Sequence, residues 1–527
     1  MGAKQVIVIY DEGNSHNSEG KLTAPVVIIS IVVASVGLMF GYETGSYGGV
    51  KTMQPFLKKF FPRILRKLSN SNADQYCVFD SSKLQAYSSS FYIAGIFSAL
   101  LAGRLTTSAG RKGALIIGGM VYLIGVSLQT VAVNLEMLVF GRILIGFGIG
   151  FASQAAPMYL VEMAPTKWRG AIATGFPLFF EIGVFTAKWI NNYLIHVYPN
   201  SSNGWRIALG LSALPATVMT VLSFFIPDTP SSLIQRGKVQ EALKSLNQVR
   251  SVDVDTENEL KYLVTYYEAM RNASEKPYQM LLEKKYRPQL VLAMAIPAFR
   301  QLVGMHLIGN FGPLVLRSLG AGWKQVFLTS FIHGTVVILS VLVATYLIDR
   351  IGRKMLLLEA GVQIFVSLVI MGILMAVQTS QNGVTSFSVQ SAVVALVIRS
   401  SINAAFSWSW GTIVWILPSE VLSLEVRAAG QGLSLAFNFA FQFLVIQTMF
   451  PMLCNFKSGV FFFYAGWSVI MTLFVIFFVP ETKRIPLESM DIIWRNHWYW
   501  KRYVHGPNTL LNPEIDRQFS SSHKSVN

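Results

Sequence analysis

The stretch from Pro297 to Pro313 reads PAFRQLVGMHLIGNFGP and lies in an apolar run long enough to cross a bilayer. It carries four side chains that could recognise a small polar solute: Arg300, Gln301, His306 and Asn310. Polar groups in hydrocarbon are costly unless they face a bundle interior or a watery cavity. Its three glycines and two prolines are typical of a helix that breaks or admits a close neighbour. We therefore interpret this stretch as a substrate-binding helix.

Glu43 and Arg142 are ionisable residues inside two other apolar runs. An ionisable residue at membrane depth is a functional hypothesis by default. Burial favours the neutral form of a carboxyl group, whereas a nearby arginine favours its charged form. A contact that changes during a transport cycle would therefore couple protonation to conformation. The alternative is a static buried ion pair.

Further charged groups lie in the apolar runs. Glu181 follows Pro177 by four residues, so the two share one helix face. Arg300 could pair with Glu181 or meet an anionic solute, and His306 could titrate near neutral pH. Arg399 and His333 could also contribute polar groups to the substrate site. Each has a structural alternative, because an arginine can extend to the membrane surface and a histidine can bond a backbone carbonyl.

Composition indicates a polytopic membrane protein. Hydrophobic residues make up 52% of the 527 residues and charged residues only 13%, whereas a soluble protein carries about 25% charged residues. The apolar runs have the length of membrane helices rather than of β-barrel strands. The net charge of +16 is concentrated in loops, as the positive-inside rule expects, which argues against a nucleic-acid partner.

Twelve spans in two halves of six organise the chain. Predicted segments are a cytoplasmic tail at 1–22, a first half at 23–226 with an extracellular lid loop at 49–82, a cytoplasmic helical linker at 227–288, a second half at 289–479 and a cytoplasmic tail at 480–527. The predicted spans are 24–47, 84–103, 114–132, 136–158, 171–194, 206–226, 289–316, 325–348, 355–377, 391–417, 429–451 and 458–479.

The halves repeat each other in short motifs. YLVEMAPTKWRG recurs as LPSEVLSLEVRA, Gly-Arg-Lys recurs after span 8, and Pro-Asp-Thr at 227–229 recurs as Pro-Glu-Thr at 480–482. Charged residues in these motifs could form ion pairs that latch one conformation; solvated loop charges are the alternative. The predicted gating residues are Arg104, Arg111, Glu162, Arg169, Asp349, Arg353, Glu420 and Arg427.

These motifs carry a family resemblance. Five segments resemble sugar porters of the major facilitator superfamily, specifically the plant sugar-transport-protein branch of monosaccharide–proton symporters. These segments are GYETGSYGGV, GRILIGFGIGFASQAAPMYLVEMAP, LIDRIGRK, WSWGTIVWILPSEVLSLEVRAAGQG and PETKRIPLE. The resemblance covers nearly the whole chain beyond the N-terminal tail. It implies an alternating-access carrier driven by the proton gradient, with no cofactor or metal.

The resemblance also implies residue roles. A family aspartate at the position of Glu43 carries the proton, and the arginine matching Arg142 is its partner. A disulfide at the positions of Cys77 and Cys454 ties the extracellular lid to the second half; two free thiols are the alternative.

The substrate site keeps part of the family pattern. Gln301, Trp415 and Phe40 match the family's amide and two aromatics, whereas Pro177, Arg300 and His306 stand where the family has amides. Each hydroxyl bond left unmade should weaken binding by about 1–3 kcal/mol. The predicted substrate-binding set is Phe40, Pro177, Glu181, Arg300, Gln301, His306, Asn310, Trp415 and Asn438.

Three hypotheses for function remain. The first is a proton-coupled symporter of a monosaccharide or related polar solute. The second keeps the carrier fold but transports an organic anion or zwitterion, and the third is a substrate sensor that does not transport. No enzyme motif is apparent. The resemblance implies a monomer in the plasma membrane, with the vacuolar membrane as the alternative.

Overall fold

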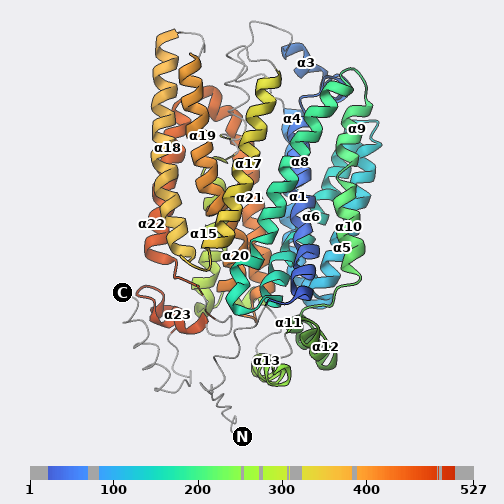
Figure 1. Cartoon of the computed structure of the whole chain (residues 1–527), viewed down its shortest axis with the longest axis vertical. Helices are drawn as coiled ribbons and strands as arrows, with labels where there is room; N and C mark the ends of the chain where they lie inside the picture. The colour runs from blue at the N-terminus through green and yellow to red at the C-terminus, as the bar shows by residue number, and fades with distance from the viewer. Residues whose placement is uncertain are drawn as a thin grey trace.

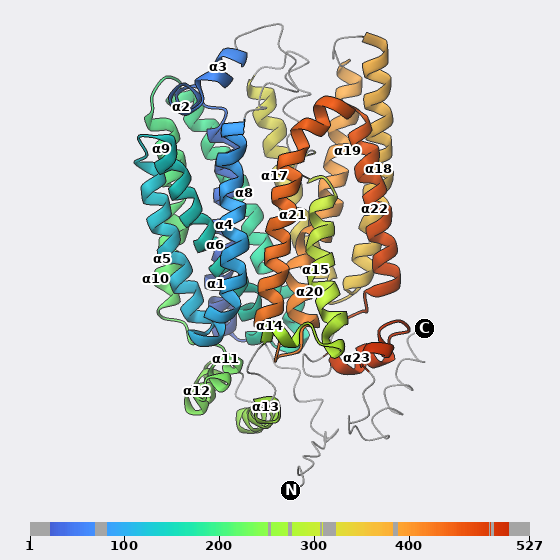
Figure 2. The same cartoon turned by 180° about the vertical axis from the view of Figure 1, so that it is seen from behind.

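The computed structural model of the chain describes residues 22–68, 82–250, 255–271, 277–305, 308, 323–382, 388–483, 485 and 490–504. Within these ranges the regular structure is helical and no strand occurs. Long helices run side by side in two bundles that follow one another in the sequence, as Figure 1 and Figure 2 show. The predicted all-α membrane fold is therefore confirmed.

The N-terminal bundle contains six membrane crossings, two of which are interrupted. The fifth begins with a short turn of helix before the main segment, and the sixth is broken at Leu211 and Ser212. The helices are α1 (Ala24–Val50), α4 (Ser82–Ser108), α5 (Gly110–Thr130), α6 (Leu135–Met163), α7 (Arg169–Ala173), α8 (Gly175–Val197), α9 (Asn203–Gly210) and α10 (Ala213–Ser223), with a 3₁₀ turn at Thr166–Trp168.

The C-terminal bundle contributes the other six crossings. Its helices are α15 (Arg287–Leu302), α17 (Trp323–Leu347), α18 (Arg353–Asn382), α19 (Val389–Trp408), α20 (Trp410–Val421), α21 (Arg427–Phe456) and α22 (Gly459–Phe478). Eleven segments in the described ranges have the length and hydropathy of a membrane span. The more polar α15 supplies the twelfth crossing.

Two predicted spans are interrupted. In the span at 289–316, α15 ends at Leu302 and Gly304 has a φ of +80°, a conformation that glycine adopts without the strain of a side chain; residues 309–316 lie outside the described ranges. The span at 391–417 is two helices, because Ser409 leaves helical geometry between α19 and α20. Both breaks lie in segments that carry predicted substrate residues.

A stripe of glycines brings α1 and α8 into backbone contact. A Cβ atom on Gly37 would collide with the carbonyl oxygen of Phe176, and one on Gly41 with that of Phe180. Small residues at a spacing of four allow helix backbones to approach closely within a membrane. This packing sets the distance between the face of α1 that bears Phe40 and the face of α8 that bears Pro177.

Short helices cover both ends of the bundles (Figure 2). At one end, α2 (Gln54–Phe60) and α3 (Pro62–Leu68) lie within the predicted lid loop, and Phe56 packs on Trp205 with ring centroids 5.8 Å apart. At the other end lie α11 (Pro230–Gln235), α12 (Val239–Val249), α13 (Thr256–Arg271), α14 (Pro277–Met280), a 3₁₀ turn at Lys284–Tyr286, α23 (Met490–Asn496) and α24 (Lys501–Val504). The helix α12 coincides with the expected helical spacing at Val239–Val249.

Candidate functional site

Glu43 and Arg142 form a buried ion pair. Glu43 lies on α1 and Arg142 on α6, and the Arg142 Nη1 atom donates to Glu43 Oε1 at 3.0 Å. Both side chains are 2% exposed. The guanidinium also lies 4.1 Å from the ring centroid of Tyr47 and 4.9 Å from that of Tyr87. The aromatic faces favour the cation, so the arginine would keep favourable contacts if the carboxylate became neutral.

The ion pair consists of a single hydrogen bond. Glu43 Oε2 and Arg142 Nε lie buried with no hydrogen-bond partner among the described residues. Just along α1, Tyr42 and Ser46 both donate to the carbonyl oxygen of Ala208, at 3.1 and 3.2 Å. The backbone around Glu43 is thus anchored to α9, while the carboxylate has only one bond to lose.

Three predicted substrate residues come together within the C-terminal bundle. On α15, Arg300 Nη1 and Gln301 Nε2 both donate to Asn438 Oδ1 on α21, at 3.2 and 2.8 Å. The amide nitrogen of Asn438 is buried without a partner in the described part of the chain. Gln301 and Asn438 are 4% and 2% exposed. Adjacent amide and guanidinium groups of this kind can exchange bonds with hydroxyl groups of a solute.

Aromatic side chains from both halves meet beside this group. The ring centroids of Phe40 and Trp415 lie 6.2 Å apart at 88°, and those of Phe176 and Trp415 lie 4.8 Å apart. The Trp415 indole nitrogen is buried without a partner in the described ranges, and the Arg300 guanidinium is 5.2 Å from the Trp415 ring. An aromatic face with a free donor suits a ring that has an apolar face and hydroxyl edges.

Pro177 and Glu181 lie on α8, on the other side of the bundle interface. Pro177 is buried and Glu181 is partly exposed. The charges that act on Glu181 are those of Lys188 and Arg300, but Glu181 forms no ion pair within 4.0 Å in the described part of the chain. The structural Arg300–Glu181 pair considered from the sequence is therefore absent, and Arg300 bonds Asn438 instead.

Several predicted residues lie outside the description. His306, Asn310 and Cys77 fall beyond the described residues. Cys454 lies in α21, but its side chain is not among those described. The predicted Cys77–Cys454 disulfide and the roles of His306 and Asn310 accordingly stay predictions.

Sequence reasoning missed Lys188. It lies seven residues after Glu181 on α8, and its charge acts on Glu181, His333 and Arg399. A lysine in the middle of the fifth apolar run, in phase with Pro177 and Glu181, was the available signal.

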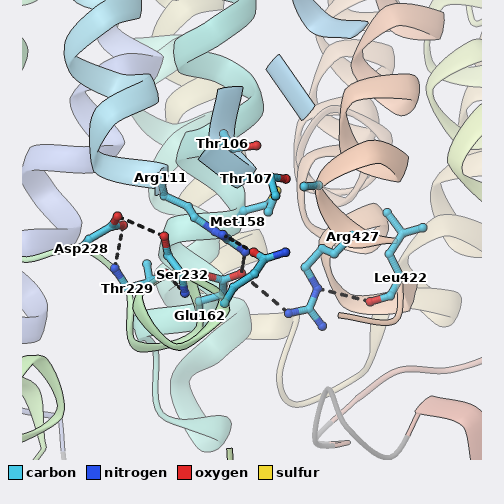
Figure 3. Close-up of polar contacts among 12 residues, drawn as sticks. Thr106, Thr107, Arg111, Met158, Glu162, Asp228, Thr229, Ser232, Leu422 and Arg427 are labelled. Atoms are coloured by element: carbon cyan, nitrogen blue, oxygen red, sulfur yellow. Dashed lines mark hydrogen bonds and ion pairs between the residues drawn. The ribbon is translucent and has the colours of Figure 1, made fainter. Parts of the chain in front are cut away.

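At the end of the bundles where the predicted linker and C-terminal tail begin, the two halves carry matching ion-pair clusters. Arg111 donates to Glu162 at 3.0 Å, and Thr229 donates to the other oxygen of Glu162 at 2.6 Å (Figure 3). In the second half, Arg353 and Thr482 donate to Glu420 at 2.7 Å each. The repeated motifs seen in the sequence therefore build repeated contacts.

A second carboxylate completes each cluster. Asp228 accepts from the backbone nitrogen of Lys112 at 3.2 Å, and Glu481 accepts from that of Lys354 at 3.0 Å. The Pro-Asp-Thr and Pro-Glu-Thr motifs thus cap the helices that begin with Gly-Arg-Lys, because a carboxylate satisfies the free N–H groups of a helix start.

Among the described residues, several contacts join the two halves at this end. Arg427 Nη1 lies 3.9 Å from Glu162 Oε1, as Figure 3 shows. Gln154 Nε2 donates to the Ala428 carbonyl oxygen at 2.9 Å. The Ala171 backbone nitrogen donates to Asp349 Oδ2 at 2.9 Å, and the hydroxyls of Thr174 and Thr345 lie 2.8 Å apart. The two halves are therefore in contact at this end, which the sequence predicts to be cytoplasmic.

The remaining predicted gating residues have other contacts. Arg169 donates to the Ile485 carbonyl oxygen at 3.1 Å, which links the first half to the C-terminal segment. Asp349 pairs with Arg353 at 3.0 Å. Arg104 is exposed and forms no ion pair with any residue in the described ranges. The shorter ion pairs among these residues thus lie within a half, at 2.7–3.0 Å, and the pair between the halves is longer, at 3.9 Å. The sequence had left open which partners each arginine takes.

Comparison with known proteins identifies the family. Residues 29–494 match the family described as "Sugar (and other) transporter". The chain belongs to this family. It is 44% identical to sugar transport protein 5 of Arabidopsis thaliana over 502 residues, which cover 95% of this chain and 98% of the relative. It is 41% identical to a hexose carrier protein of Ricinus communis, with 94% of this chain and 96% of the relative covered.

A solved structure supports the fold of this family member. The major facilitator superfamily proton:xylose symporter bound to 6-bromo-6-deoxy-D-glucose superposes with a TM-score of 0.77 at 23% identity, covering 90% of this chain and 100% of that one. The predicted twelve-helix major facilitator fold is confirmed, and the chain is a transporter rather than an enzyme.

Proposed function

We propose that this protein is a proton-coupled symporter of a monosaccharide or a related polyhydroxylated solute. The observation that carries the proposal is the Glu43–Arg142 ion pair, buried within the first half. Relatives named as sugar transport proteins and a hexose carrier support the solute class, and the named proton:xylose symporter supports the coupling ion.

Alternating access follows from the closed cytoplasmic end. The contacts of Glu162 with Arg427 and of Ala171 with Asp349 join the halves there. They must break when the halves rock apart to open toward the cytoplasm. Glu162 and Asp349 each also bond a residue of their own half, Arg111 and Arg353 respectively. The halves can therefore part while these ion pairs within each half stay intact.

Proton coupling would work through the single bond of Glu43. A proton from the outside binds the Glu43 carboxylate, forms an O–H bond and removes the charge that attracts Arg142. Arg142 remains beside the rings of Tyr47 and Tyr87. Release of the proton toward the cytoplasm restores the ion pair and resets the carrier, so the proton gradient supplies the driving force and no other cofactor is required.

Solute recognition would use the converging amides and aromatics. Gln301 and Asn438 present amide groups, and Phe40 and Trp415 present ring faces that suit the apolar surface of a sugar. Arg300 and Glu181 instead favour the second candidate, an organic anion or zwitterion, since they bring charge to positions beside the amides. The protein would act as a monomer in the plasma membrane.

Uptake into vesicles tests the proposal. The full-length protein is reconstituted, an inward proton gradient is imposed, and accumulation of labelled hexoses, pentoses, polyols and sugar acids is measured with and without a protonophore. We expect at least one solute to accumulate above its external concentration and to lose that accumulation with the protonophore. Accumulation that the protonophore leaves unchanged would contradict the coupling, and saturable flux would exclude a sensor that only binds.

A further inference from the structure

A cavity of about 460 Å³ lies at the linker end of the first half, between the start of α5, the residues that follow α10 and the short helices α11 and α12. Figure 2 shows α11 and α12 below the ends of α5 and α10. Two hydrogen bonds hold α12 in this place. Ser245 donates to the carbonyl oxygen of Asp228 at 2.9 Å, and Thr23 donates to that of Val249 at 2.7 Å. The cavity is therefore walled by helices that are tied to the bundle.

Positive charge is in excess in the lining of this cavity. The charged lining residues are four basic side chains and two carboxylates: Lys112, Arg236, Lys238, Lys244, Asp228 and Glu241. Arg236 pairs with Asp228, and Lys238 pairs with Glu241 at 3.0 Å. Neither Lys112 nor Lys244 forms an ion pair with any residue in the described ranges. Two positive charges are therefore left without a carboxylate.

The two unmatched lysines come from opposite walls of the cavity. On α5, Lys112 Nζ donates to the Phe224 carbonyl oxygen at 2.9 Å, which fixes its ammonium group at the end of α10. On α12, Lys244 is exposed and forms no hydrogen bond with any residue in the described part of the chain. The nearby carboxylate of Asp228 is engaged by Arg236 and by the Lys112 backbone nitrogen. An anion that enters the cavity would therefore meet one positioned ammonium group and one that can move to it.

Exposed aromatic residues place this cavity beside the bilayer. Phe224 and Phe225, just after α10, are 56% and 81% exposed. They stand where an apolar helix ends, which is the depth at which a bilayer gives way to its headgroups. Ile116 of α5 contributes an apolar side chain to the cavity itself. A molecule that entered from the bilayer could thus lay apolar chains against the phenylalanines and direct a charged group toward the lysines.

The second half covers the corresponding place with its own residues. Lys354 matches Lys112 in the repeated motif and likewise donates to a carbonyl oxygen at the end of a helix, that of Ile476, at 2.9 Å. There the indole nitrogens of Trp498 and Trp500 donate to the carbonyl oxygens of the last two residues of α22, at 2.8 Å each. In the first half the same position is a cavity with basic walls. The difference between the two repeats favours a site that a separate molecule fills.

We propose that this cavity binds the phosphorylated headgroup of an anionic phospholipid, from the leaflet at the predicted cytoplasmic surface. Lys112 and Lys244 would contact the phosphate oxygens, since basic groups at the membrane surface attract anionic headgroups and bond strongly to phosphate. The acyl chains would lie along α10 beside Phe224 and Phe225. A soluble phosphorylated compound would make the same polar contacts but would leave these aromatic side chains uncovered. The inference is independent of the transported solute and of proton coupling.

Retention of three probes tests the site. Native mass spectrometry of the purified full-length protein in detergent compares phosphatidylinositol 4-phosphate, phosphatidylinositol with the same acyl chains, and the free headgroup inositol 1,4-bisphosphate, all at one concentration. The two lipids differ in a single phosphate group, and the third probe lacks the acyl chains. We expect the phosphorylated lipid to be retained about tenfold more than either of the others. Equal retention of the two lipids would overturn the phosphate contact, and equal retention of the free headgroup would overturn the assignment to a lipid.

Variants of the two lysines locate the effect. Lys112→Gln combined with Lys244→Gln should lower retention of the phosphorylated lipid about tenfold, and Lys244→Gln alone, a change at an exposed side chain, should lower it about threefold. Lys354→Gln is the matched control, because it alters the same motif position in the second half. Lys261→Gln controls for an exposed lysine of α13. Unchanged retention in Lys244→Gln, or an equal loss in either control, would overturn the site.

Discussion

Arg427 of the second half lies 3.9 Å from Glu162 of the first half, and their side chains are 0% and 1% exposed. Glu162 is also the carboxylate that binds Arg111 and Thr229 within its own half. Under the proposed alternating access, the Glu162 carboxylate would keep its contacts with Arg111 and Thr229 and lose its contact with Arg427. We therefore expect a change at Arg427 to weaken closure of the predicted cytoplasmic end while the pair between Glu162 and Arg111 remains.

We expect Arg427→Gln to favour opening toward the cytoplasm. Loss of the charge removes the attraction to Glu162 but leaves the pair between Glu162 and Arg111. Net uptake should fall about tenfold, whereas solute affinity in detergent should change less than threefold. Uptake and binding measured side by side check this.

A surface ion pair provides the control for Arg427. Lys238 pairs with Glu241 at 3.0 Å in the linker, and the two side chains are 49% and 55% exposed; such pairs contribute about 0–1 kcal/mol. Lys238→Gln should keep uptake within twofold. Wild-type uptake in Arg427→Gln would show that this contact does not hold the cytoplasmic end closed.

Loss of the clustered carboxylates should destabilise the two halves unequally. Removing one member of a buried pair leaves an unpaired charge and costs about 3–5 kcal/mol. Glu420→Gln leaves Arg353 its second carboxylate, Asp349, at 3.0 Å. Glu162→Gln leaves Arg111 with no second carboxylate within 4.0 Å in the described residues. Thermal unfolding in detergent should show the larger decrease in Tm for Glu162→Gln; the reverse order would contradict the geometry.

The glycine stripe predicts a steric effect on assembly. Gly41→Ala places a methyl group against the Phe180 carbonyl and should prevent α1 from packing on α8. Gly48 lies on the same helix with nothing within 4 Å of a built Cβ, so Gly48→Ala is the matched control. We expect folded Gly41→Ala protein to fall below a tenth of wild type in size-exclusion profiles. Equal yields of the two variants would refute the close approach.

The fold was largely predictable from the sequence because the bilayer constrains it. Apolar runs and repeated motifs give helices and their order. The glycines and prolines of the span at 289–316 predicted a break, which lies after Leu302. The break at Ser409 was not predictable in this way, since a polar residue can interrupt a helix without interrupting hydropathy. The sequence left open whether Arg300 pairs with Glu181 or meets an anionic solute, and in the structure its guanidinium donates to Asn438 Oδ1.

Ionisable residues inside apolar runs were the most informative sequence signal for the site. Glu43 and Arg142 lie far apart in the chain, yet both are ionisable within apolar runs, and the structure brings them within 3.0 Å. Lys188 carried the same signal and was overlooked. Partner choice among the cytoplasmic arginines could not be read from spacing, because several carboxylates lie within reach at the ends of the helices.

The most direct test of the central claim measures two modes of transport in Glu43→Gln. A glutamine keeps the shape of the side chain but cannot take up and release a proton, so accumulation driven by an inward proton gradient should fall to the level of passive equilibration. Exchange of labelled for unlabelled solute across the same vesicles should persist. Glu136→Gln, at an exposed carboxylate at the start of α6, should behave as wild type in both modes. Gradient-driven accumulation retained in Glu43→Gln would contradict proton coupling through the Glu43–Arg142 pair.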